Sequence, residues 1–250
     1  MLQIVPIPAF RDNYIWLLHD ARHAIVIDPG DAVPVQEKLD SLNLRLTDIL
    51  ITHHHDDHIG GVANLLKRHQ PNVYAPQYGR YIFQHHAVGE GDTVSIPLIG
   101  LEFIVMHLPG HTQDHIAYLG DNLLFCGDVL FGAGCGRLLD GTPAQMLQSL
   151  NRLKELPPET MVYCAHEYTQ QNIEFALTLE PNNPDLIKRR SEVRYLRDQN
   201  LPTLPSTINI ELKTNPFLRC QQAGITLNSQ AINSSELSVF TAIRTLKNNY

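Results

Sequence analysis

The chain has 250 residues, 43% of them hydrophobic, which is enough for an ordered large domain with or without a smaller appendage. With 19 basic and 26 acidic residues its net charge is −7, which argues against a nucleic-acid-binding protein that must neutralise phosphates. The four cysteines form no CxxC pair, so the sequence indicates neither a disulfide framework nor a thiolate zinc site, and a reducing compartment fits best. Residues 1–10 lack a signal-peptide pattern and no apolar run approaches the roughly 20 residues that span a bilayer. We therefore expect a cytoplasmic protein that binds no membrane.

Short β-rich segments dominate the first two-thirds of the chain. The predicted strands are residues 3–7, 14–18, 23–27, 48–51, 73–75, 101–107, 116–119, 123–126 and 161–164. Apolar residues at three- and four-residue spacing predict helices at residues 33–41, 59–69 and 143–153. This alternation predicts an α/β fold in which helices cover sheets.

The pattern changes after about residue 166, where long helical stretches begin. These are residues 169–179, 185–199 and 235–247, and a loop rich in Pro and Asn at residues 201–209 separates the second from the third. We therefore predict two domains, a catalytic domain of residues 1–166 and an α-helical domain of residues 167–250.

A cluster of metal-binding side chains follows the predicted strand 48–51. Residues 52–58 read THHHDDH, four imidazoles and two carboxylates in seven positions, and a glycine pair then leads into the next helix. The cluster thus lies at the carboxyl end of a strand, where α/β proteins usually bind ligands. Alternate residues of an extended segment point the same way, so His53 and His55 can converge on one ion while Asp57 and His58 face a second.

Four residues cannot complete two metal sites, so further ligands are expected at other strand ends. His111, Asp128 and His166 each follow a predicted strand closely, as the first cluster does. Taken singly, Asp128 also fits a turn and His166 also fits a helix cap. Their common position makes all three candidate ligands.

Five motifs run in order along the chain: THHHxDH, PGHT, FCGDVLF, GCGR and YCAHEYT. They resemble the pattern of the metallo-β-lactamase superfamily and, within it, that of glyoxalase II, the hydroxyacylglutathione hydrolases. The resemblance extends to Asn215, Pro216 and Phe217 and to the terminal helix. It implies an αββα sandwich of the metallo-β-lactamase type with a smaller C-terminal helical domain.

The resemblance also implies a binuclear metal site. One ion would be bound by His53, His55 and His111, and the other by Asp57, His58 and His166, with Asp128 bridging the two. Zinc is the expected metal, and iron and manganese are alternatives because His and carboxylate ligands accommodate all three. A water shared by the ions would supply hydroxide as the nucleophile, and Asp57 would orient it.

The reaction that the resemblance implies is hydrolysis of the thioester S-D-lactoylglutathione to glutathione and D-lactate, the second step of methylglyoxal detoxification. We expect a monomer whose partner is this small substrate. Glutathione carries two carboxylates, for which Arg244 and Lys247, three apart on one helix face, and Arg137, after the GCG loop, are candidate cations. In relatives the matching positions, with Tyr168, bind the glycine carboxylate.

Some residues near the motifs depart from the pattern or fall outside it. Leu139 stands where many relatives have Tyr, which puts one hydroxyl contact to glutathione in doubt, and Asp56 adds a charge that we do not assign as a ligand. We interpret His54 and His115 as structural or supporting residues, and Asp28, in an Asp-Pro-Gly turn, as structural.

Other functions are weighed against hydrolysis. Persulfide dioxygenases of the superfamily use one iron, many β-lactamases have Cys at the position of Asp128, and RNA-processing members usually carry an inserted domain. A thioesterase that acts on another thiol carrier remains an open alternative. The alternative outside the enzymes is a non-catalytic protein in which the metal ions only hold loops together. Three terminal ligands per ion and a shared bridge leave room for water, which favours catalysis.

Overall fold

The computed structural model describes residues 2–250, and contacts between Cα atoms divide the chain into two compact units. The first unit comprises the residues up to His107 together with Asp114–Gly127, and the second comprises Leu108–Gln113 with Asp128–Tyr250. Because this division follows contacts and not sequence order, the domain boundary at residue 166 stays a prediction. None of the helices that the structure describes is long and apolar enough to cross a membrane.

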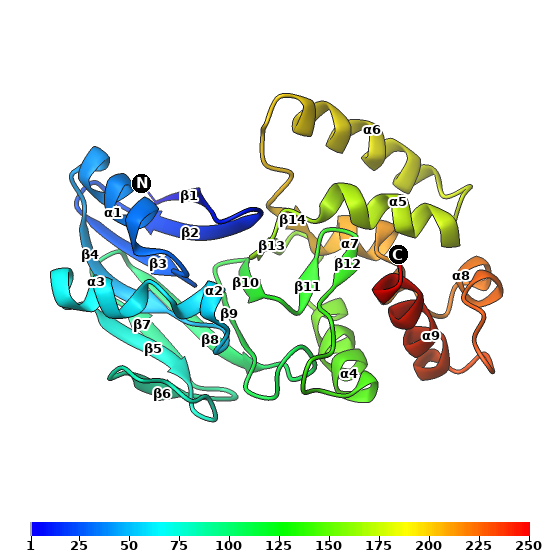
Figure 1. The fold of residues 1–250 in the computed structure, drawn as a ribbon, viewed down its shortest axis with the longest axis horizontal. Coiled ribbons are helices and arrows are strands. Elements are labelled where there is room, and N and C mark those ends of the chain that lie inside the picture. The colour runs from blue at the N-terminus through cyan, green and yellow to red at the C-terminus, as the bar shows by residue number, and fades with distance from the viewer. Residues whose placement is uncertain (1) are drawn as a thin grey trace. The chain divides into compact units, whose positions relative to one another are not determined.

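The first sheet of the first unit mixes antiparallel and parallel strands (Figure 1). In order across the sheet these are β1 (Gln3–Ala9), β2 (Asn13–His19), β3 (His23–Ile27), β4 (Arg45–Leu50), β5 (Asn72–Pro76) and β6 (His86–Val88). β1, β2 and β3 pair antiparallel, whereas β3 to β6 pair parallel. The parallel strands need crossover connections, which are α1 (Ala32–Leu42) after β3 and α2 (Asp56–Ile59) with α3 (Val62–His69) after β4.

Helices α1 and α3 cover one face of this sheet (Figure 1). Leu39 of α1 and Leu65 of α3 join a buried apolar cluster with Ile49 and Ile51 of the β4 segment. These two isoleucines are two residues apart and so point to the same face. Leu50 between them is also fully buried, as expected of a parallel strand that is covered on both faces.

The second sheet of the first unit covers the other face. Its strands are β7 (Thr93–Ile96), β8 (Leu101–His107), β9 (Ile116–Gly120) and β10 (Leu123–Gly127), which pair antiparallel in chain order. The ring of Phe103 contacts those of Tyr118 and Phe125 edge to face. The Tyr118 hydroxyl donates to the carbonyl oxygens of Ile51, at 3.0 Å, and Tyr74, at 3.2 Å, so the two sheets pack face to face.

The second unit is mainly helical. Its strands are the hairpin β11 (Leu130–Phe131) and β12 (Gly134–Cys135) and the pair β13 (Met161–Cys164) and β14 (Ser206–Thr207). Its helices are α4 (Pro143–Lys154), α5 (Thr169–Leu179), α6 (Pro184–Asp198), α7 (Ile208–Thr214), the 3₁₀ helix η1 (Pro216–Leu218), α8 (Ala223–Asn228) and α9 (Glu236–Asn248). Helix α4 begins with a capping box in which Thr142 and Gln145 satisfy each other's backbone N–H groups.

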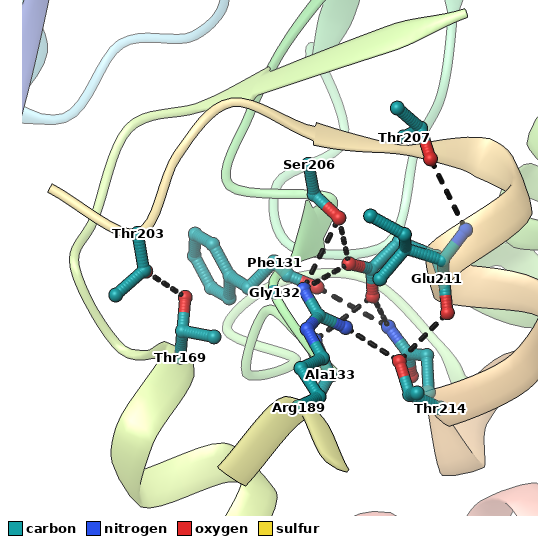
Figure 2. Close-up of polar contacts among 12 residues, drawn as sticks. Phe131, Gly132, Ala133, Thr169, Arg189, Thr203, Ser206, Thr207, Glu211 and Thr214 are labelled. Carbon is teal, nitrogen blue, oxygen red and sulfur yellow. Dashed lines mark hydrogen bonds and ion pairs between the residues drawn. The ribbon is translucent and has the colours of Figure 1, made fainter. Parts of the chain in front are cut away.

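A buried polar network holds the β11–β12 hairpin in the second unit (Figure 2). Glu211 of α7 is fully buried and forms an ion pair of 2.6 Å with Arg189 of α6. Its second oxygen accepts hydrogen bonds from the Ala133 backbone N–H, at 2.8 Å, and from Asn215 Nδ2, at 3.0 Å. Asn215 Nδ2 also donates to the Gly134 carbonyl oxygen at 2.9 Å. The hairpin is therefore positioned by helix residues that follow it by about 80 positions.

All nine predicted strands are confirmed, with small shifts at their ends. The prediction of one helix over residues 59–69 was wrong, because α2 ends at Ile59 and α3 begins at Val62. A Cβ atom on Gly60 would lie 2.7 Å from the Gly30 carbonyl oxygen, and one on Gly61 would lie 2.6 Å from the Pro29 carbonyl oxygen. The glycine pair thus lets the metal-binding segment pack directly against the turn after β3.

Candidate metal centre

The loop after β4 brings two predicted ligands together in the first unit. His53 is fully buried, and its Nε2 lies 2.9 Å from His55 Nδ1. On the other edge of the His53 ring, Nδ1 lies 3.0 Å from the Thr52 hydroxyl. Two imidazole nitrogens directed at each other can share a proton or coordinate one divalent ion.

The short helix α2 carries the next two predicted ligands. His58 is fully buried, and its Nε2 lies 3.5 Å from Asp57 Oδ2. The Nδ1 of the same ring lies 3.0 Å from Asp28 Oδ2. A carboxylate beside Nδ1 fixes both the tautomer and the direction of an imidazole, and it directs the Nε2 lone pair toward a metal ion.

Two residues outside the predicted set orient these ligands. The expectation that Asp28 is only a turn residue was incomplete, because it contacts His58 and also accepts hydrogen bonds from the Thr52 N–H, at 2.8 Å, and hydroxyl, at 2.7 Å. Asn13, at the start of β2, donates from Nδ2 to Asp57 Oδ2 at 2.9 Å. Sequence reasoning missed Asn13 altogether, since a single buried amide has no spacing pattern.

In the second unit Asp128 lies between two imidazoles. Its Oδ2 is 3.5 Å from His111 Nε2, and its Oδ1 is 3.4 Å from His166 Nε2. The Nδ1 of His111 lies 2.7 Å from the Arg137 carbonyl oxygen, which can only accept a hydrogen bond. Nδ1 therefore carries the hydrogen, and Nε2 is the nitrogen left to bind a metal. Asp128 thus offers one carboxylate oxygen to each of the two histidines.

The imidazole–carboxylate separations within each unit suit metal ligands, whereas the 2.9 Å between His53 Nε2 and His55 Nδ1 is a hydrogen-bond distance. With bonds of about 2.1 Å, two ligand atoms of a tetrahedral ion are about 3.4 Å apart, whereas an N–H···O hydrogen bond is about 2.9 Å. The three nitrogen–carboxylate distances of 3.4–3.5 Å match the first value. The His and Asp residues therefore form groups that could hold metal ions.

The remaining polar residues of the cluster have other contacts. His54 Nδ1 lies 2.8 Å from Asp114 Oδ1, and the Tyr81 hydroxyl donates to the other oxygen of Asp114 at 3.1 Å. His115 is fully buried, and its ring stacks on that of His53 with centroids 4.7 Å apart. Asp56 is exposed. These contacts give His54 and His115 supporting positions without requiring them as ligands.

The predicted substrate-binding residues all lie in the second unit. The Tyr168 ring stacks on His166, with centroids 4.7 Å apart and planes 5° apart. Arg244 is only 4% exposed and donates from Nη1 to the Cys135 carbonyl oxygen at 2.7 Å. Burial, followed by the charges of Arg244 and Arg137, lowers the pKa of Lys247 to about 8. The three cations are thus close enough to repel one another, and a carboxylate bound among them would relieve that repulsion.

Comparisons with known proteins place the chain in a family. The model of the metallo-beta-lactamase superfamily matches residues 9–166, and that of the hydroxyacylglutathione hydrolase C-terminus matches residues 167–250. The hydroxyacylglutathione hydrolase of Methylobacillus flagellatus is 53% identical over 250 residues, and that of Nitrosomonas eutropha is 50% identical over 254, each match covering 100% of both chains. The chain belongs to the hydroxyacylglutathione hydrolase family.

The fold of this hydroxyacylglutathione hydrolase family member is the predicted α/β fold of the metallo-β-lactamase type with a helical C-terminal region. The solved structure of TTHA1623 in a di-iron-bound form has a TM-score of 0.63 and 26% sequence identity, over 86% of this chain and 100% of that one. Membership of the superfamily implies that the chain binds divalent metal, and its His and Asp groups fit that role. As a family member it is a hydrolase.

Proposed function

We propose that this protein hydrolyses S-D-lactoylglutathione to glutathione and D-lactate with two divalent metal ions, and so acts in methylglyoxal detoxification. The observation that carries the metal chemistry is Asp128, whose two oxygens face His111 and His166 at 3.5 and 3.4 Å. The substrate is supported by similarity to hydroxyacylglutathione hydrolases over their full length. The relative from Methylobacillus flagellatus has 53% sequence identity to this chain. An acyl thioester on another carrier is the nearest alternative.

The ligands that we propose for the two ions are those that the sequence motifs and the resemblance indicate. The first ion would be held by His53, His55 and His111, the second by Asp57, His58 and His166, with Asp128 between them. Within each unit, the imidazole–carboxylate separations of 3.4–3.5 Å support this assignment.

Hydrolysis breaks the C–S bond of the thioester, forms a C–O bond to water and releases a thiolate. When bound, two divalent ions would lower the pKa of a shared water and polarise the thioester carbonyl. Asp57 would accept a hydrogen bond from that water and orient it, and Asn13 holds one Asp57 oxygen so that the carboxylate cannot rotate freely. A thiol has a pKa near 8.5, so its thiolate leaves without a strong general acid.

The second unit would bind the glutathione part of the substrate. Arg137, Arg244 and Lys247 form a cluster of positive charge, and among residues 2–250 none of the three pairs with a carboxylate. The Nε–H of Arg244 is buried without a hydrogen-bond partner. Together with the Tyr168 hydroxyl they would bind the glycine carboxylate of glutathione by charge-assisted hydrogen bonds. Leu139 is 61% exposed and supplies no hydroxyl, so contact at that position would be apolar.

The remaining parts of the proposal are the metal, the setting and the domain division. Zinc suits imidazole and carboxylate ligands, as do iron and manganese. Four buried free cysteines support a reducing compartment, the cytoplasm, and we propose a monomer there. The two family models meet between residues 166 and 167, which supports a catalytic domain up to residue 166 and a substrate-binding domain after it.

The decisive experiment measures thiol release from S-D-lactoylglutathione by purified protein loaded with zinc. Turnover well above that of chelator-treated protein is the expected result, and equal rates would sink the proposal. A parallel assay with lactoyl-coenzyme A separates the carriers. Faster turnover of the coenzyme A thioester would mean that the protein is a thioesterase whose substrate is not a glutathione thioester.

A further inference from the structure

Three buried phenylalanines form a row in the second unit. Phe175 comes from α5, Phe217 from η1 and Phe240 from α9, and each is at most 2% exposed. Phe175 and Phe217 are stacked with centroids 6.4 Å apart and planes 20° apart, whereas Phe240 meets Phe217 edge to face at 5.8 Å. The first two rings therefore present nearly parallel faces, and the third is turned away from them.

Each of the two parallel rings has a cation of α9 over it. The Arg244 guanidinium carbon lies 5.0 Å from the centre of the Phe217 ring, and Lys247 Nζ lies 5.2 Å from that of Phe175. Residues three apart on a helix have Cβ atoms about 5–6 Å apart. The 6.4 Å between the two rings is close to this spacing, so one turn of α9 sets one cation over each ring.

The rings attract two cations that pair with no carboxylate among residues 2–250. Arg244 is 4% exposed, and its Nη1 donates to neutral groups, among them the Cys135 carbonyl oxygen at 2.7 Å. Lys247 Nζ lies 3.5 Å from the Gln171 carbonyl oxygen and 5.0 Å from the centre of the Tyr250 ring. The negative face of an aromatic ring attracts a cation without neutralising it. The two cations are thus held in place while their charge stays available to an anion.

We propose that Phe175 and Phe217 are a platform that fixes the position of Lys247 and Arg244 and thereby makes the protein selective for thioesters whose thiol carrier bears a carboxylate at the position of the glutathione glycine. This inference rests on the proposed function, because it assigns the cations to the substrate. The two phenylalanines are positioning residues, which act through the cations and touch no reacting atom. The rival interpretation is that all three rings are ordinary core residues.

The test compares Phe175→Leu with Phe240→Leu. Leucine keeps an apolar side chain in the core but removes the ring face. Phe240 is a matched control because no cation of the described part of the chain lies over its ring. The substrates are S-D-lactoylglutathione and the same thioester with its glycine carboxylate blocked as an ethyl ester. Thermal unfolding of each variant shows that it is folded.

The platform predicts weaker substrate binding for only one combination of variant and substrate. Phe175→Leu raises KM for S-D-lactoylglutathione about three- to tenfold with kcat nearly unchanged, and its KM for the ethyl ester equals that of the wild type. Phe240→Leu leaves both KM values unchanged. The platform is refuted if Phe175→Leu raises KM for the ethyl ester as much as for S-D-lactoylglutathione, or if Phe240→Leu raises KM as much as Phe175→Leu does. Phe175 and Phe217 would then be ordinary core residues.

A binding measurement separates this inference from the proposed function. Calorimetric titration of the folded proteins with glutathione alone is expected to show about three- to tenfold weaker binding in Phe175→Leu and no change in Phe240→Leu. If the wild type binds glutathione but hydrolyses neither thioester, the proposed function fails and this difference still decides the platform. If the wild type binds no glutathione, both fail.

Discussion

The charge of Lys247 makes substrate binding depend on pH in a way that can be calculated. Burial and the neighbouring guanidinium groups of Arg244 and Arg137 lower the pKa of Lys247 from 10.5 to about 8. A lowered lysine pKa means that the ammonium form is lost as the pH rises through about 8. With that pKa about 90% of Lys247 is charged at pH 7 and about 10% at pH 9, so KM for S-D-lactoylglutathione should rise about tenfold between them.

The measurement is a series of initial rates from pH 6 to pH 10 with zinc-loaded protein, corrected for spontaneous thioester hydrolysis. The pH dependence of kcat/KM reports groups of the free enzyme, so the Lys247 transition should appear there and not in kcat. The charged and titratable groups that face Lys247 are Arg244, Arg137 and Tyr250.

Two variants identify the titrating group. Lys247→Arg keeps a permanent charge, so its KM should stay flat from pH 7 to pH 9. Lys247→Met should have a KM that is raised and equally flat. The reasoning is refuted if the wild-type KM is flat to pH 10, or if Lys247→Arg shows the same rise, because another group would then be titrating.

Three further predictions concern the ligands and the core. Asp128→Ala should lose metal content and activity together, and elemental analysis that finds both ions still bound would contradict the bridge. Asn13→Ala should weaken metal binding or lower kcat about 10- to 100-fold, because Asp57 loses the hydrogen-bond donor that orients it. Metal affinity is measured by competition with a chelator. If both metal affinity and kcat equal those of the wild type, Asn13 is a packing residue. Glu211→Gln should leave Arg189 as an unpaired buried charge and cost about 3–5 kcal/mol in urea unfolding. A loss below about 1 kcal/mol would mean that the pair is solvated.

The ligand candidates stand in motifs that can be read from the sequence, whereas the residues that support them do not. His53, His55 and His58 stand in a dense motif, and each has a clear chemical reason to be there. Asp28 carried a signal that could have been used, because β3 and β4 are adjacent parallel strands whose carboxyl ends meet, with Ile27 opposite Leu50. A carboxylate one residue past β3 must therefore lie beside the metal loop.

The secondary structure that sequence reasoning missed is short or depends on tertiary contacts. Strands β6 and β7 have three and four residues, too few for an alternation of polar and apolar side chains to stand out. The break between α2 and α3 depends on the close approach of the turn after β3, which local propensity does not contain. The burial of Arg244 is of the same kind, since helix spacing alone predicts a solvated arginine.

The Arg189–Glu211 network has a consequence for how this protein can be recombined with its relatives. The β11–β12 hairpin lies within the segment that matches the superfamily model, whereas Glu211 and Asn215, which hold it, lie within the segment that matches the C-terminal model. A chimera that exchanges everything after residue 166 would replace these anchors while keeping the hairpin. The two parts must therefore be inherited or engineered as a matched pair, with Glu211, Asn215 and the Ala133 segment transferred together.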